Sequence, residues 1–123
     1  MKKKIAEQWV RALRSGRYKQ GKDCLREHTP DGLRYCCLGV LCRISKLGNF
    51  TADDYYYTGV AVKNDESNQY LPEGVQKWAK MYSPEGHTQD EIGTNEESLV
   101  DLNDSGKTFR EIAKYIETNY KKL

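Results

Sequence analysis

Tyr35-Cys36-Cys37-Leu38-Gly39-Val40-Leu41-Cys42 is an eight-residue stretch without a charged or amide side chain. The chain around it has 123 residues, of which 31% are charged, and a mean hydropathy of -0.86. We expect this stretch to anchor the core, because burial of apolar surface drives folding. Gly39 costs about 1 kcal/mol of helix propensity. That cost is tolerated if the backbone of another element comes close to it.

The residues before and after the start of this stretch predict a β-hairpin that leads into a short buried helix. Segments 23–27 and 33–37 flank Thr29-Pro30-Asp31-Gly32, whose Pro-Asp-Gly order is typical of a tight turn. Apolar side chains then recur at helical spacing over 38–47, before Gly48. The stretch therefore passes from strand into helix.

Two further helices are indicated in the first two thirds of the chain. Apolar residues recur every three or four positions over 3–15, and Gly16 follows where a C-terminal cap belongs. Leu71-Pro72 opens another helix, because proline is favoured in the first turn, and Pro84 stops it. Its apolar face consists of Val75, Trp78, Ala79 and Met81.

The last third contains two capping boxes, in which side chains bond the free amides at a helix start. Thr94 with Glu97, and Thr108 with Glu111, match this S/T-x-x-E pattern. The first predicts a short helix that ends at Asn103-Asp104-Ser105-Gly106. The second predicts a longer helix, with a core stripe made of Phe109, Ile112, Ala113 and Ile116.

Tyr55-Tyr56-Tyr57 and Gly59-Val60-Ala61-Val62 favour β structure. We therefore expect one or two strands within 54–63 that complete a small antiparallel sheet with the hairpin at about 23–37. The predicted fold class is α+β, with this sheet packed against four to five helices. A chain of this length fits a single domain over 1–123.

Composition points to a cytosolic protein. No run approaches the roughly 18 apolar residues of a membrane span, and Met1-Lys2-Lys3-Lys4 leads directly into a charged helical pattern rather than a secretory signal. The four cysteines are then expected to be reduced thiols. Hydrophobic residues make up 37% of the chain, and nine of them are tyrosines, so the core is thin. We expect a homo-oligomer, because association or a bound ligand stabilises such a domain.

Charge is distributed unevenly, although the formal net charge is only +2. Residues 1–22 hold eight basic side chains and one acid, whereas residues 85–104 hold seven acids and no Lys or Arg. The two segments either attract each other within or between subunits, or the basic one faces a phosphate-bearing partner. A third interpretation is that both segments are solvated faces with no specific role, because surface charge pairs contribute little to stability.

The cysteines lack the spacing of a zinc site. Cys24, Cys36-Cys37 and Cys42 contain no C-x₂-C pair, and adjacent residues of a strand point to opposite faces. We expect buried thiols that act as small hydrophobes, with no metal and no other cofactor.

The sequence also lacks signs of a catalytic site. Nothing in it orients His28 or His87 toward a thiol, and the common phosphate-loop, dinucleotide-binding and metalloprotease motifs are missing. A small hydrolase or thiol enzyme is thus a minority interpretation, and we expect a protein that is not an enzyme.

The segment from Arg14 to Lys22 has the composition of a phosphate-binding loop. Arginine binds phosphate, glycine lets the backbone approach a ligand, and tyrosine stacks on a base. A plain solvated loop has the same composition, so that alternative stays open. Long nucleic acid is disfavoured because the acidic segment repels a polyanion. The candidate ligand-binding residues are Arg14, Arg17 and Lys19 for phosphate, Tyr18 for stacking, Gln20, Asn103 and Asp104 for polar edges, and Arg26 and Arg34 as further cations.

Four segments carry a resemblance that covers nearly the whole chain. They are Trp9-Val10-Arg11-Ala12-Leu13-Arg14-Ser15-Gly16-Arg17-Tyr18-Lys19-Gln20-Gly21, the stretch from Tyr35 to Cys42, Leu71-Pro72 through Trp78, and Leu102-Asn103-Asp104-Ser105-Gly106 through Phe109, Ile112 and Ala113. In them the chain resembles a family of small uncharacterised proteins encoded by tailed bacteriophages and prophages. The resemblance implies a phage origin and a setting in the host bacterial cytosol, and it supplies no catalytic residues.

Three functions are compatible with these observations. The first is a non-catalytic phage protein that antagonises host defence by binding and sequestering a small nucleotide-type immune signal, such as a cyclic nucleotide or a relative of cyclic ADP-ribose. The resemblance suggests this role by analogy with other small phage proteins. The second is an inhibitor or adaptor that binds a host protein. The third is the small hydrolase or thiol enzyme described above.

Overall fold

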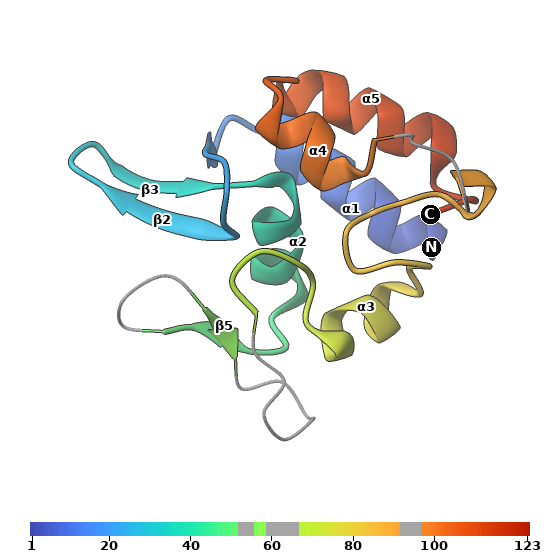
Figure 1. Cartoon of the computed structure of the whole chain (residues 1–123), viewed down its shortest axis with the longest axis horizontal. Helices are drawn as coiled ribbons and strands as arrows, with labels where there is room; N and C mark the ends of the chain where they lie inside the picture. The colour runs from blue at the N-terminus through green and yellow to red at the C-terminus, as the bar shows by residue number, and fades with distance from the viewer. Residues whose placement is uncertain (52–55, 59–66, 92–96) are drawn as a thin grey trace.

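The first and last helices of the chain lie side by side in the computed structural model, which describes residues 1–51, 56–58, 67–91 and 97–123 (Figure 1). The helices are α1 (Lys3–Arg14), α2 (Cys37–Ser45), α3 (Glu73–Ala79), α4 (Leu99–Asp104) and α5 (Phe109–Asn119), with a 3-10 turn η1 at Gln89–Glu91. The strands are β1 (Lys19–Gln20), β2 (Arg26–Thr29), β3 (Gly32–Tyr35), β4 (Asn49–Phe50) and β5 (Tyr57–Thr58). These elements confirm the α+β class.

Helices α1 and α5 form where the apolar periodicity predicted them. Trp9 is fully buried, and its indole Nε1 donates to the carbonyl of Cys37 at 2.9 Å, which ties α1 to α2. The predicted Thr108–Glu111 capping box opens α5 and is confirmed. Hydrogen bonds from Thr108 lower the pKa of the Glu111 carboxyl. The apolar stripes that meet between these two helices are Ile5, Ala6, Trp9, Val10 and Leu13 on α1, and Phe109, Ile112, Ala113 and Ile116 on α5.

The predicted hairpin is confirmed in β2 and β3, which pair in antiparallel register from Arg26↔Tyr35 to Thr29↔Gly32. Gly32 has a φ of +113°, a value that favours glycine in the turn. The predicted bounds are 23–27 and 33–37. The first strand instead begins at Arg26 and runs to Thr29, and the second stops at Tyr35 because Cys36 caps α2. Strand β1 adds to β3 in parallel, so the sheet is mixed, in the order β1-β3-β2.

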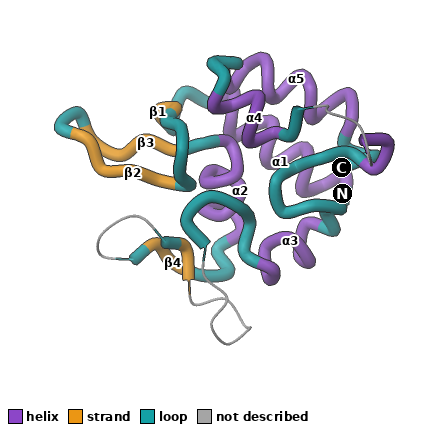
Figure 2. Tube along the Cα trace, viewed as in Figure 1, coloured by secondary structure: helices purple, strands orange, loops and turns teal. Residues whose placement is uncertain are grey.

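The strand expected within 54–63 exists as β5, but it does not join the hairpin. It pairs with β4 in a separate two-stranded antiparallel sheet (Figure 2). Tyr56 is described but precedes the strand, and positions 54–55 and 59–63 of that prediction lie outside the described residues. Rings of Tyr35, Phe50 and Tyr57 connect the two sheets edge to face, with centroids 5.9 and 5.0 Å apart.

Two predicted helix boundaries are wrong. The capping box that opens α4 consists of Ser98 and Asp101, because Ser98 stands directly before the first helical residue. Thr94, the start predicted from sequence, lies outside the described residues. Helix α3 ends at Lys80, which adopts a left-handed conformation with a φ of +54°, before Pro84 is reached.

Helix α2 lies at the centre of the fold, and the stretch quoted first supplies its buried residues. It contacts α1, α3, α4 and β3 (Figure 1). Gly39 permits this position, since a Cβ atom there would lie 1.8 Å from the carbonyl oxygen of Leu25. The backbone amide of Cys36 donates to the same oxygen at 3.2 Å. None of the described helices is long and apolar enough to cross a membrane.

Replacing Gly39 with Ala should therefore lower the free energy of unfolding by about 2 to 3 kcal/mol, because the new methyl group meets backbone atoms that have no free rotation. Urea denaturation followed by circular dichroism measures this loss. Gly16→Ala is the control, since it meets no atom within 4 Å and carries only the strain of a φ of +76°, about 1 kcal/mol. A Gly39→Ala protein as stable as the wild type would show that the close approach is not required.

Candidate functional site

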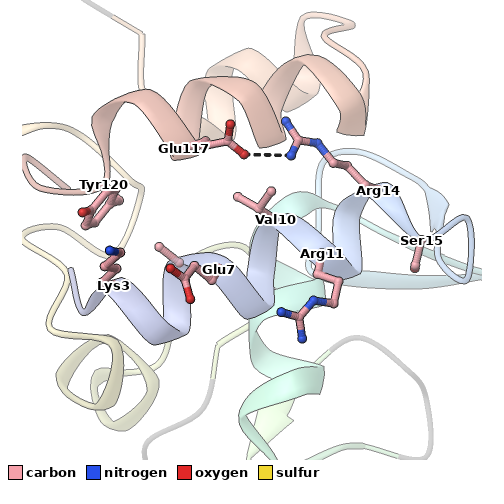
Figure 3. A pocket seen from close by; sticks show the side chains of 9 residues that line it. Lys3, Glu7, Val10, Arg11, Arg14, Ser15, Glu117 and Tyr120 are labelled. Carbon is pink, nitrogen blue, oxygen red and sulfur yellow. Dashed lines mark hydrogen bonds and ion pairs between the residues drawn. The ribbon is translucent and has the colours of Figure 1, made fainter.

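The nine residues predicted to bind a ligand are divided among several places. Arg17, Tyr18 and Lys19 line one hollow, and Gln20, Arg34, Asn103 and Asp104 line another. Arg14 lies in a groove between α1 and α5 (Figure 3). The Arg26 guanidinium lies over the Phe50 ring, 4.3 Å from its centre.

The hollow that contains Arg17, Tyr18 and Lys19, here called the cationic hollow, has a volume of about 350 Å³. The parallel pairing of β1 with β3 brings the segment after α1 beside the hairpin, while the last turn of α2 closes another side. The full lining is Arg17, Tyr18, Lys19, Asp31, Leu33, Tyr35 and Arg43.

Aromatic rings form one wall of the cationic hollow. The half-buried Tyr18 ring meets Tyr35 edge to face, with ring centroids 5.2 Å apart. Tyr35 is only 7% exposed and is backed by the Phe50 ring. This packing fixes the Tyr18 ring, so it offers a preformed surface to a planar group.

The charges of the cationic hollow are predominantly positive. Arg17, Lys19 and Arg43 form no ion pair with a carboxylate in the described part of the chain. The Lys19 ammonium donates to the backbone carbonyl of Asp31 at 3.3 Å. The three cations and the Asp31 carboxylate give the lining a net charge of +2. A lining of this charge favours the binding of an anion.

Arg43 belongs to this hollow although sequence reasoning missed it. It follows the apolar stretch directly. The signal in the sequence was that a charged residue next to a fully buried segment must lie at the edge of that segment. Only the tertiary fold, which brings Arg43 into one lining with Arg17 and Lys19, shows that it faces this hollow.

Asn103 and Gln20 form a polar clamp that holds β1 in place. Asn103 is only 3% exposed, and all of its side-chain groups are used. Its Oδ1 accepts from the Cys37 amide at 3.1 Å and from Gln20 Nε2 at 3.0 Å. Its Nδ2 donates to the Gly21 carbonyl at 2.9 Å and to Asp104 Oδ1 at 3.1 Å. One buried amide thus connects β1, α2 and α4.

Gln20 extends the polar clamp to α5. Its Nε2 also donates to the Lys107 carbonyl at 2.7 Å, and its Oε1 accepts from the Phe109 amide at 2.9 Å. Because the groups of Gln20 and Asn103 are engaged within the chain, these contacts favour a scaffold role for both residues. That they read the polar edges of a ligand stays a prediction.

A second hollow, of about 510 Å³, lies beside the polar clamp and is balanced in charge. Arg34 donates to the Gln20 carbonyl at 3.2 Å, and Asp104 Oδ1 accepts from the Asp23 amide at 3.1 Å. Lys22 and Arg34 face Glu27 and Asp104 among the lining residues, so the net charge there is zero. Arg14 is likewise neutralised, since its guanidinium lies 2.7 Å from Glu117. Neither place matches the charge excess of the cationic hollow.

The thiols are poor candidates for nucleophiles. Cys36, Cys37 and Cys42 are buried, and Cys24 is half-buried. Burial raises the pKa of the Cys36 thiol to about 12 and that of Cys37 well above its usual value. Partial burial and the neighbouring Glu27 carboxylate raise the pKa of Cys24. Within the described ranges, no three His, Cys, Asp or Glu side chains gather to hold a metal ion.

One comparison with known proteins gives a match. A family model described as a domain of unknown function (DUF8296) matches residues 1–120. Neither the curated proteins nor the solved structures contain a match. The matched residues include the whole lining of the cationic hollow and both residues of the polar clamp.

Alkylation with iodoacetamide at pH 7.5 should distinguish the four thiols. A thiol with a pKa of about 12 is ionised in fewer than about one molecule in 10,000 at this pH. Mass spectrometry of the native protein should therefore find slow modification of Cys24, and modification at all four positions only in urea. Rapid labelling of Cys36 or Cys37 in the native protein would instead support the thiol-enzyme interpretation.

Asn103→Ala should lower the free energy of unfolding by about 3 kcal/mol, because the buried Cys37 amide and Gly21 carbonyl lose their partner. Urea denaturation measures the change. The control is Asn119→Ala, which removes one bond from Nδ2 to the Tyr115 carbonyl within α5 and should cost less than about 1 kcal/mol. Equal effects of the two changes would contradict a role of Asn103 as the central connection.

Proposed function

We propose that this chain, which belongs to the DUF8296 family, binds a small phosphate-bearing ligand of the nucleotide type in the cationic hollow and sequesters it without changing it. One observation carries the proposal. Arg17, Lys19 and Arg43 converge on a hollow with an aromatic wall, and in the described part of the chain none of them pairs with a carboxylate.

Each lining group has a role in this proposal. Arginine binds phosphate through two parallel hydrogen bonds, and lysine acts as a point charge. The Tyr18 ring offers a stacking surface for a base. A volume of about 350 Å³ lies within the usual range of small-molecule sites. Asp31 is the group in the hollow that accepts hydrogen bonds from ribose hydroxyls or base amines.

The charge distribution favours a small anion over a long one. Of the eight basic residues in 1–22, Arg14 is the one that pairs with a carboxylate in the described part of the chain. Among the described acids of 85–104, Asp90 pairs with Lys122 and Asp101 forms a capping box with Ser98, and none forms an ion pair with the basic residues of 1–22. The basic segment is therefore available to a ligand. The acidic segment, which lies elsewhere in the chain, opposes a long polyanion.

The biological setting that we propose rests on the sequence resemblance. A phage-encoded protein in the host bacterial cytosol that removes a cyclic nucleotide or a cyclic ADP-ribose relative from solution would antagonise host defence. The raised pKa of the thiols supports a non-catalytic role, because a protonated thiol is a weak nucleophile.

Thermal unfolding with a panel of cyclic dinucleotides, cyclic trinucleotides and cyclic ADP-ribose isomers tests this function. A ligand present at about a hundred times its dissociation constant should raise the unfolding midpoint by several degrees. The ligand is then released by denaturation and examined by chromatography. Intact ligand supports sequestration, whereas altered ligand indicates an enzyme. No shift across the panel would favour a host protein as the partner.

Paired variants locate the binding site. Arg17→Ala together with Arg43→Ala should weaken the affinity for the stabilising nucleotide about a hundredfold or more, because two charge-assisted hydrogen-bonding groups are lost. Isothermal titration calorimetry measures the dissociation constant. The control, Arg110→Ala with Lys121→Ala, removes the same charge from exposed positions outside the hollow. If both double variants bind alike, the site is elsewhere.

A further inference from the structure

A groove between α1 and α5 has a volume of about 630 Å³. Val10 points into the space between the two helices, and the Arg14–Glu117 pair closes one end of the groove (Figure 3). Lys3 and Tyr120 lie at the other end (Figure 3). Residues of the cationic hollow do not line this groove.

The rim of the groove carries charges of alternating sign. Lys3, Glu7 and Arg11 recur every four residues along α1, so they follow one another along the same side of the helix. All three are exposed, and none of them forms an ion pair within the described residues. Arg14, by contrast, is already paired with Glu117.

We propose that this groove is the contact between two copies of the chain, with the two α1 helices antiparallel across a two-fold axis. A crossing centred midway between Glu7 and Arg11 sets Glu7 of each copy against Arg11 of the other. The same arrangement sets Lys3 of each copy against Ser15 of the other. There the last carbonyls of the helix carry partial negative charge.

A two-fold contact requires a surface that is complementary to itself. The charges on α1 meet this condition at Glu7 and Arg11. When the second helix is reversed about the point midway between these residues, Glu7 lies opposite Arg11 of the other copy and Arg11 lies opposite its Glu7. A uniformly acidic partner would be repelled by Glu7, and a uniformly basic one by Lys3 and Arg11. Because the groove carries charges of both signs, a partner with alternating charges, such as a second copy of the chain, matches it better than a partner of one sign.

The middle of the groove supplies the apolar part of the contact. Ala6 and Val10 form its floor, with Tyr120 beside them. Ala6 and Val10 are already only 3% and 7% exposed, so a second copy would exclude water chiefly from Tyr120 and from the side chains of Arg14 and Glu117, which are 42% and 60% exposed. Association would also add buried surface to a chain whose hydrophobic content is only 37%.

Sedimentation velocity of the full chain with charge-reversed variants tests the contact. The wild-type protein should form dimers at tens of micromolar. Glu7→Arg and Arg11→Glu should each weaken dimerisation at least about tenfold, because each places like charges opposite one another twice. An equal mixture of the two variants should form a heterodimer, since both facing pairs are then of opposite charge. Lys46→Glu, at an exposed position that does not line the groove, is the matched control and should dimerise normally.

Three results would overturn the contact: a monomeric wild type up to several hundred micromolar, a dimer that both reversals leave intact, or a mixture that stays monomeric. Circular dichroism of each variant shows whether the helices remain folded, and restoration in the mixture is itself evidence of folded chains. Because Arg17 and Arg43 lie outside the groove, the ligand measurements and the dimer measurements can fail independently.

Discussion

The buried amide of Asn103 connects segments of the chain that are far apart in sequence. It joins β1 and the residue after it, 83 and 82 positions away, and the start of α2, 66 positions away. Gln20 carries the connection on to the start of α5. Without these bonds a strand of two residues has little reason to stay beside β3, because an isolated pair of short strands is marginal in water. The position of Tyr18 and Lys19 beside the hairpin therefore depends on a side chain in α4.

Local signals in the sequence account for most of the fold. The hairpin follows from its Pro-Asp-Gly turn, α5 from the Thr108–Glu111 box, and the central helix from its uncharged stretch. The prediction for Gly39 is also confirmed, since the Leu25 backbone occupies the space that a side chain would need. Each of these features depends on residues close together in the chain or on a general steric rule.

The candidate site was harder to predict because it depends on distant contacts. A Lys-Gln pair has no β signal, so β1 and its parallel pairing could not be foreseen. Arg14 and Arg17 are three positions apart, yet α1 ends between them, and the two side chains line different surfaces. The polar residues of the Leu102-Asn103-Asp104-Ser105-Gly106 segment resemble ligand contacts in sequence, whereas the structure uses Asn103 inside the chain. Arg43 joins the site only through the tertiary fold.

The end of α1 separates two surfaces of different character. Before Ser15, charges of both signs alternate around an apolar groove, and such a surface suits a partner with the same alternation. After Gly16, the cations lie around an aromatic wall, with Asp31 as the acidic residue of the lining.

The most direct measurement is a titration of the ¹⁵N-labelled protein with inorganic pyrophosphate, followed by amide chemical shifts. Binding in the cationic hollow predicts saturable shifts at Arg17–Lys19, Asp31–Leu33 and Arg43, with none along 3–11 of α1. Saturation centred on α1, or no shift at millimolar pyrophosphate, would contradict it.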